Sequence, residues 1–86
     1  MELFIGSAEE AALVRSGISP EDVRAVFSAG RRTKNIVFDE STGDCVTGGC
    51  TGNTTLWVVF REETSRSVLV NAYFHRMQVD GITIIS

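Results

Sequence analysis

The chain has 86 residues, so we expect residues 1–86 to form one domain around a single hydrophobic core. Hydrophobic residues make up 43% of the sequence, and no apolar run approaches the roughly 20 residues that a membrane helix needs. The formal net charge of −3 gives no general attraction to DNA, RNA or anionic lipid. Residues 1–6 lack the basic flank and the length of a signal peptide, so we expect a cytoplasmic protein with no membrane partner.

The first helix is expected over residues 8–16, after a short apolar segment at residues 2–5 with the character of an edge strand. Ser7 and Glu10 form a capping-box pattern, in which the hydroxyl accepts from a first-turn amide and the carboxylate reaches back. Gly17 supplies the left-handed residue that ends this helix.

The second helix is expected over residues 20–29, with Ser19 as its N-cap and Pro20 at the first helical position. Gly30 is interpreted as its end. The apolar stripe of this helix consists of Val23, Val26 and Phe27.

Short strands are expected at residues 35–39 and 45–47, separated by turn residues at 41–44. The glycine-rich segment 48–53 is interpreted as a turn that interrupts the second of these strands.

The stretch 54–77 organises the chain, because two runs of β-branched and aromatic residues flank a short polar connection. Residues 55–60 are predicted to be an interior strand that pairs antiparallel with residues 68–74. The first run is apolar on both faces, which is typical of a strand in the middle of a sheet with both sides covered. One face carries Leu56, Val58 and Phe60, and the other carries Trp57 and Val59.

A last hairpin is predicted near the C-terminus, where Asp80-Gly81 separates residues 77–79 from residues 82–84. Asp-Gly between alternating residues favours a type I′ turn. Because the strands follow the helices, we predict an α+β domain with two N-terminal helices packed on a four- to five-stranded antiparallel sheet.

This order resembles the RelE superfamily, and especially its BrnT-like branch of small toxin-type domains. The resemblance covers about residues 8–79 and is carried by residues 15–23 (RSGISPEDV) at the helix junction and residues 67–77 (SVLVNAYFHRM) in the late strand. It implies a RelE-like fold, a ribonuclease activity and an antitoxin-like protein partner. The chain departs from the family pattern because it is acidic, whereas the family's ribonucleases are typically basic.

The candidate catalytic residues lie at the end of the late strand. His75 is the only histidine and titrates near neutrality, so it suits general acid or base catalysis, and Arg76 suits the charge of a phosphorane. Tyr73 is a third candidate, although it titrates far above neutrality. Alternation puts Tyr73 and His75 on one face with Asn71, and Arg76 on the other with Val68, so their pairing needs a strand end or a bulge. The alternative is a partly buried His75 that hydrogen-bonds beside Tyr73.

Arg31, Arg32 and Lys34 form a basic cluster that is expected just after the second helix. These side chains are candidates for binding phosphate groups. They suit equally the negative end of the helix dipole, or a turn in solvent.

Cys45 and Cys50 are expected to be free thiols in a reducing compartment. A zinc site would need His75 as a third ligand and Asp44 as a poor fourth, so we expect no metal and no other cofactor. A reversible disulfide remains open, because glycines at 48–49 allow a sharp turn between the two cysteines.

The sequence is compatible with two functions, one non-catalytic and one enzymatic. The first is a non-catalytic binding or subunit module, in which Trp57, Tyr73 and Met77 supply contact area beside Asn71. Its partner is a protein, either antitoxin-like or a second copy of the chain. The alternative is a toxin–antitoxin ribonuclease that uses His75 and Arg76, but the net charge disfavours RNA as a ligand.

Overall fold

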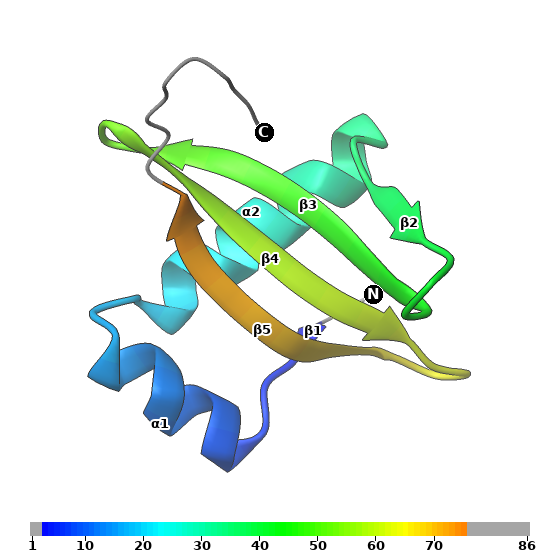
Figure 1. Ribbon diagram of the computed structural model, residues 1–86, viewed down its shortest axis with the longest axis horizontal. Coiled ribbons are helices and arrows are strands. Elements are labelled where there is room, and N and C mark those ends of the chain that lie inside the picture. Colours follow the sequence, from blue (N-terminus) through cyan, green and yellow to red (C-terminus); the bar gives the residue numbers. More distant parts are fainter. Residues whose placement is uncertain (1–2, 76–86) are drawn as a thin grey trace.

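The computed structural model describes residues 3–75, in which two helices pack on one face of a five-stranded sheet (Figure 1). The elements are β1 (Leu3–Phe4), α1 (Ser7–Arg15), α2 (Pro20–Thr33), β2 (Val37–Asp39), β3 (Asp44–Thr51), β4 (Thr54–Glu62) and β5 (Ser67–His75). The strand order is β1-β5-β4-β3-β2, so four strands form a meander and β1 lies at its far edge.

The prediction of an α+β fold with two N-terminal helices and up to five strands is confirmed, but the prediction of a purely antiparallel sheet is wrong. β1 pairs with β5 in parallel, through Leu3 with Ser67 and Phe4 with Val68. The helices and the meander together form the long crossover that a parallel pair requires. The other three pairings are antiparallel.

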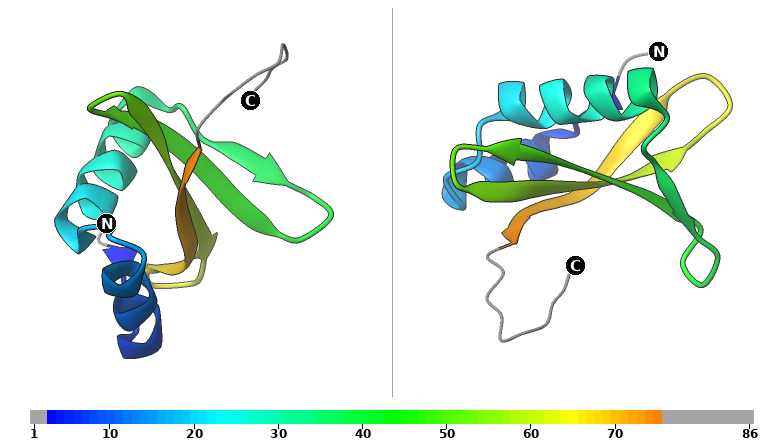
Figure 2. Two further views of the ribbon diagram at one scale, coloured as in Figure 1. Left: turned by 60° about the vertical axis from the view of Figure 1, so that its left-hand side comes forward. Right: turned by 90° about the horizontal axis from the view of Figure 1, so that it is seen from above.

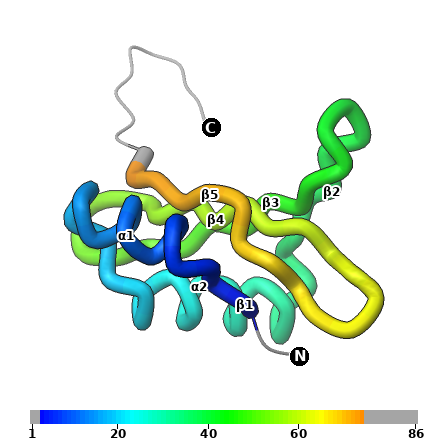
Figure 3. Tube along the Cα trace, turned by 90° about the horizontal axis from the view of Figure 1, so that it is seen from below, coloured from blue at the N-terminus to red at the C-terminus, as the bar shows by residue number. Residues whose placement is uncertain are grey.

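Both helices lie on the same side of the sheet (Figure 2). α2 runs along β3 and β4, and α1 lies beside β5 near the edge that β1 completes (Figure 3). No helix or strand among residues 3–75 covers the opposite side. No helix in the described range is long and apolar enough to cross a bilayer.

α1 begins one residue earlier than the capping box predicts. Its N-cap is Gly6, whose carbonyl accepts the first helical hydrogen bond from the amide of Glu10, and the helix start has no side-chain cap. Ser7 lies within the helix, so the prediction that Ser7 caps it is wrong. The predicted end is confirmed, because Gly17 has φ of 76° and the amide of Ile18 donates back to the carbonyl of Leu13.

α2 begins where the sequence predicts, and the amide of Glu21 donates to the Ser19 hydroxyl at 3.2 Å. The predicted end at Gly30 is wrong, because the helix continues to the left-handed Lys34. Gly30 is buried against β3, and a Cβ at this position would overlap Oγ1 of Thr47. The glycine therefore allows a close approach of helix and sheet.

The core lies between α2 and the central strands. The rings of Phe27 and Phe60 meet edge to face, with centroids 4.9 Å apart and an interplanar angle of 89°. The core residues are Leu3, Leu13, Ile18, Val23, Val26, Phe27, Cys45, Leu56, Val58, Phe60, Leu69 and Ala72.

β3 runs without interruption through the two glycines that the sequence analysis placed in a turn, so that interpretation is wrong. The actual turn has two residues and begins at Gly52, whose φ of 65° suits the first position of a type II′ hairpin. Gly49 lies under α2, where a Cβ would be 3.0 Å from Val26, and a Cβ on Gly48 would be 2.6 Å from the ring of Trp57 on the other side. These glycines serve packing on the two faces of the strand.

The predicted central pairing of residues 55–60 with residues 68–74 is confirmed, with one irregularity. Val59 pairs with Asn71 but Phe60 pairs with Leu69, so Val70 is an extra residue in a bulge. The predicted alternation of faces from Val68 to the end of the strand is therefore wrong. The bulge places Val68 on the same face as Asn71 instead of the opposite one. Both Arg76 and the hairpin predicted at Asp80-Gly81 lie outside the described residues.

We expect Phe27→Ala to lower the free energy of unfolding by about 3–5 kcal/mol, because Phe27 is buried and anchors α2 on Phe60. Ser28→Ala is the control, since the neighbouring side chain is exposed. Urea unfolding followed by circular dichroism measures both. Equal small losses would show that α2 is not docked through Phe27.

Candidate binding face of the sheet

The candidate site is the side of the meander opposite the two helices, which we call the open face. Its position follows from β4, where Leu56, Val58 and Phe60 are fully buried toward α2 and the residues between them point the other way. Register then assigns the neighbouring strands. The open face contains Val37, Val46, Gly48, Cys50, Thr55, Trp57, Val59, Asn71 and Tyr73, together with the backbone position of His75.

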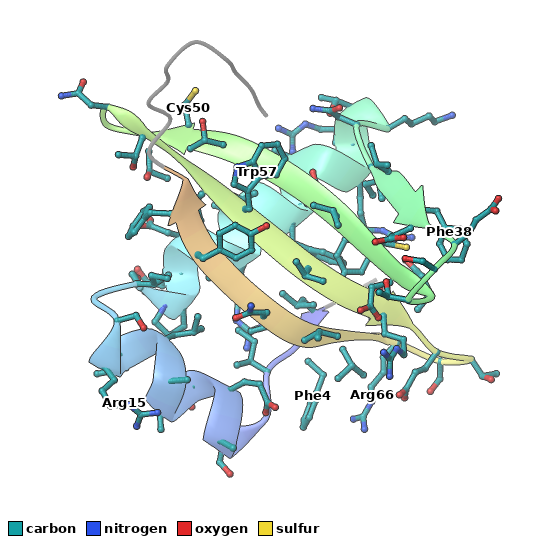
Figure 4. The ribbon with its side chains drawn as sticks, viewed as in Figure 1. Phe4, Arg15, Phe38, Cys50, Trp57 and Arg66 are labelled. Carbon is teal, nitrogen blue, oxygen red and sulfur yellow. The ribbon has the colours of Figure 1, made fainter. Side chains whose placement is uncertain are left out.

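Trp57 and Tyr73 form the centre of the open face. They are directly paired across β4 and β5, and Trp57 is also paired with Gly48 on β3. The missing side chain at Gly48 leaves room for the six-membered ring of the indole, which lies against this glycine. Figure 4 shows Trp57 on the side of the sheet away from α2, and Tyr73 is 44% exposed. Two aromatic side chains are thus presented on neighbouring strands.

The described side chains around this aromatic pair are aliphatic or polar without a charge. One row beyond it, Val37, Val46 and Val59 lie side by side on three strands, and Val37 is 65% exposed. None of the residues assigned to the open face from Val37 to Tyr73 is Asp, Glu, Lys or Arg. Such a surface suits an apolar partner better than an anionic ligand.

The nearest described ion pair lies at one end of the open face, between Arg61 and Asp44. Nη2 of Arg61 is 2.8 Å from Oδ1 of Asp44, and its Nε donates to the same oxygen at 3.0 Å. The Asp44 side chain is only 12% exposed, so this arginine is held by a largely buried carboxylate.

The predicted catalytic residues are only partly described. His75 ends β5 in a row with Thr55 and Cys50, which places its backbone at a corner of the open face beside Tyr73. The side chain of His75 and all of Arg76 lie outside the described part of the chain. Their catalytic roles therefore stay a prediction.

The predicted basic cluster is at the other end of the sheet and on its helix side. Arg31 donates to Oε2 of Glu62 at 2.6 Å and lies over the Phe27 ring at 5.5 Å from its centroid. Glu62 pairs with Ser67, the first residue of β5, about 26 Å along the strand from His75. Arg31 and Arg32 lie in the last turn of α2, where they also complement the helix dipole, and Arg32 and Lys34 are exposed.

Cys45 and Cys50 are free thiols on opposite faces of β3. They are five positions apart on one continuous strand, an odd number that reverses the side, and the separation along the strand is about 16 Å. This separation excludes a disulfide between the two cysteines, which the sequence analysis left as an alternative. It also prevents the two thiols from binding the same metal ion. No group of three or more potential metal ligands occurs within the described residues.

A small cleft separates α1 from β5, with a volume of about 60 Å³. It is lined by Glu9, Ala12, Leu13 and Ser16 on the helix and by residues 69–72 on the strand. Pockets for organic ligands are typically about 300 Å³ or larger. The open face is therefore a stronger candidate than this cleft for recognising a partner.

No family model, no curated protein and no solved structure matches this chain. The functional interpretation therefore rests on the chemistry of the open face. Sequence reasoning selected Trp57, Tyr73 and Asn71 on this face, but it missed Val37 and Val46. The sequence signal that could have indicated an apolar surface on this side of the sheet was the apolar character of residues 55–60 on both faces of their strand.

We expect a thiol reagent to modify Cys50 in the folded protein and Cys45 after unfolding. Cys50 is exposed, whereas burial, followed by the nearby Glu62 and Asp44 carboxylates, raises the pKa of the Cys45 thiol and so depletes its thiolate. Ellman's reagent, with and without denaturant, measures this order, and Cys50→Ser should abolish the reaction of the folded protein. Faster modification of folded Cys45 than of Cys50 would contradict the assigned faces.

Proposed function

We propose that this chain is a cytoplasmic, non-catalytic binding or subunit module with a RelE-like fold, and that its open face holds a protein partner. The observation that carries the proposal is the neutral aromatic and aliphatic surface around Trp57 and Tyr73. Aromatic residues in an uncharged patch are typical of the centre of a protein interface. Two helices followed by a strand meander support the RelE-like resemblance as a matter of architecture.

A nucleic-acid ligand is less well supported, although Trp57 and Tyr73 have the rings on which bases stack. Single-stranded nucleic acid also needs a positive groove along its backbone. The cations of Arg31 and Arg61 are paired with carboxylates, and the formal net charge is −3. A protein partner with apolar side chains fits the open face better.

The proposal is tested with a photo-crosslinking amino acid at two neighbouring positions of β2. Val37 is on the open face, whereas Phe38 points to the other side and has a similar exposure of 58%. In the cells that make the protein, position 37 should give a discrete adduct identifiable by mass spectrometry, and position 38 should not. Tyr73→Ala should reduce the adduct at least about tenfold, as expected for an interface anchor.

The rival function has its own signature in the same cells. A ribonuclease would arrest growth on expression and cleave RNA, and His75→Ala would abolish both effects without changing the melting curve. We expect the wild-type protein to be harmless and inactive on RNA. Growth arrest that disappears in His75→Ala would overturn the proposal.

A further inference from the structure

The outer edge of β5 is free along most of its described length. β1 pairs only with Ser67 and Val68, and it ends at Phe4, from which the chain continues into α1. From Leu69 to His75, the only strand neighbour of β5 among residues 3–75 is β4. Alternate backbone amides and carbonyls of this segment therefore point away from the sheet, as in any edge strand.

One hydrogen bond marks this edge. The amide of Ala72 donates to Oδ1 of Asn71, the side chain of the preceding residue, at 2.9 Å. A side-chain acceptor on a strand amide is typical of an edge, where no carbonyl of a neighbouring strand is present to receive the proton. An added strand would supply such a carbonyl.

The edge lacks the residues that usually prevent a strand from being added. Residues 69–74 contain no proline and no charged residue, and Val70 and Phe74 are 40% and 41% exposed. The bulge at Val70 disturbs the edge only near its start, next to the part that β1 covers. Residues 71–75 thus form a regular strand with one side open to pairing.

α1 lies alongside this edge without closing it (Figure 1). The cleft between them has a volume of about 60 Å³, and its helix side consists of Glu9, Ala12, Leu13 and Ser16, which recur at the helical period. This volume is too small for an organic molecule. A strand, however, binds through the backbone of an edge and needs only a shallow groove for its alternate side chains.

The charge of the cleft indicates the chemistry of its occupant. Glu9 is the only ionisable side chain that lines the cleft, and neither ion pair of the described residues includes it. Arg15 belongs to the opposite side of α1. A carboxylate beside an uncharged strand edge is complementary to an extended segment that carries lysine or arginine. A second copy of β5 is less complementary, because residues 69–74 bring no cation.

We propose that a protein partner adds an extended basic segment as a sixth strand along residues 71–75 of β5, in the cleft beside α1. Main-chain groups of the segment pair with β5 and take over the amide of Ala72 from the Asn71 side chain. On the helix side, an apolar side chain packs against Ala12 and a cation reaches Glu9. This site is separate from the open face and does not depend on the function proposed for that face.

Short random peptides displayed on phage are selected against the full-length protein, and the most enriched peptide is labelled and titrated by fluorescence anisotropy. We expect lysine or arginine among alternating apolar residues. Ala12→Leu, which fills the cleft, should weaken binding at least about tenfold, and Glu9→Lys should weaken it about fivefold. Ala11→Leu and Glu10→Lys are matched controls on the opposite side of α1 and should bind like the wild type. Thermal melting confirms that each variant is folded.

Hydrogen exchange followed by NMR locates the peptide without any substitution. A strand on the edge of β5 should slow the exchange of the Ala72 amide, because a backbone carbonyl replaces the Asn71 side chain as its acceptor. The amide of Val46, on the open face, should exchange at the same rate with and without peptide.

Three results would overturn the proposal. The first is that no peptide is enriched, or that the enriched peptide binds Ala12→Leu as tightly as the wild type. The second is binding that is lost in Trp57→Ala but kept in Ala12→Leu, which would place the peptide on the open face. The third is a wild-type dimer in sedimentation that dissociates in Ala12→Leu, which would assign the edge to a second copy of the chain.

Discussion

The close docking of α2 on β3 and β4 determines what the rest of the molecule can do. Gly30 on the helix and Gly49 on the strand each remove a side chain from the contact, which brings them against Thr47 and Val26. The edge-to-face pair of Phe27 and Phe60 fills the space beside them. This core covers one side of β4, which is apolar on both sides, so the other side is the surface on which the proposed function rests.

The parts of this fold that local chemistry determines could be predicted from the sequence. Ser19, Pro20 and Gly17 specify helix ends by hydrogen bonding and by a left-handed residue, which need no tertiary partner. The errors at Gly30 and Gly48 have one physical cause. A glycine that permits close packing and a glycine that permits a turn are identical in sequence, and only the neighbour across the contact distinguishes them.

The candidate site was less predictable than the fold, because register assembles it. Trp57 and Tyr73 could be selected individually as large aromatic residues, but their pairing depends on a bulge at Val70 that no local signal announced. Val37 and Val46 lie on the same face as Trp57 and Tyr73, but they come from two short strands whose pairing partners the sequence did not specify. The cysteine pair shows the converse, since a flexible loop would allow Cys45 and Cys50 to meet, whereas a continuous strand separates them.

The placement of charge gives the strongest reason to connect the open face with apolar partners. Arg31 with Glu62, and Arg61 with Asp44, use cations near one end of the sheet to neutralise carboxylates there. A surface pair such as Arg31 with Glu62 contributes about 0–1 kcal/mol to stability, so its larger effect is on where unbalanced charge can appear. Neither arginine is available as a free cation for a phosphate, and the described side chains in the rows around Trp57 include no Asp, Glu, Lys or Arg. The proposed binding of an apolar partner agrees with this electrostatic pattern, because such a surface offers no compensation for phosphate desolvation, while it costs an apolar segment little to dock.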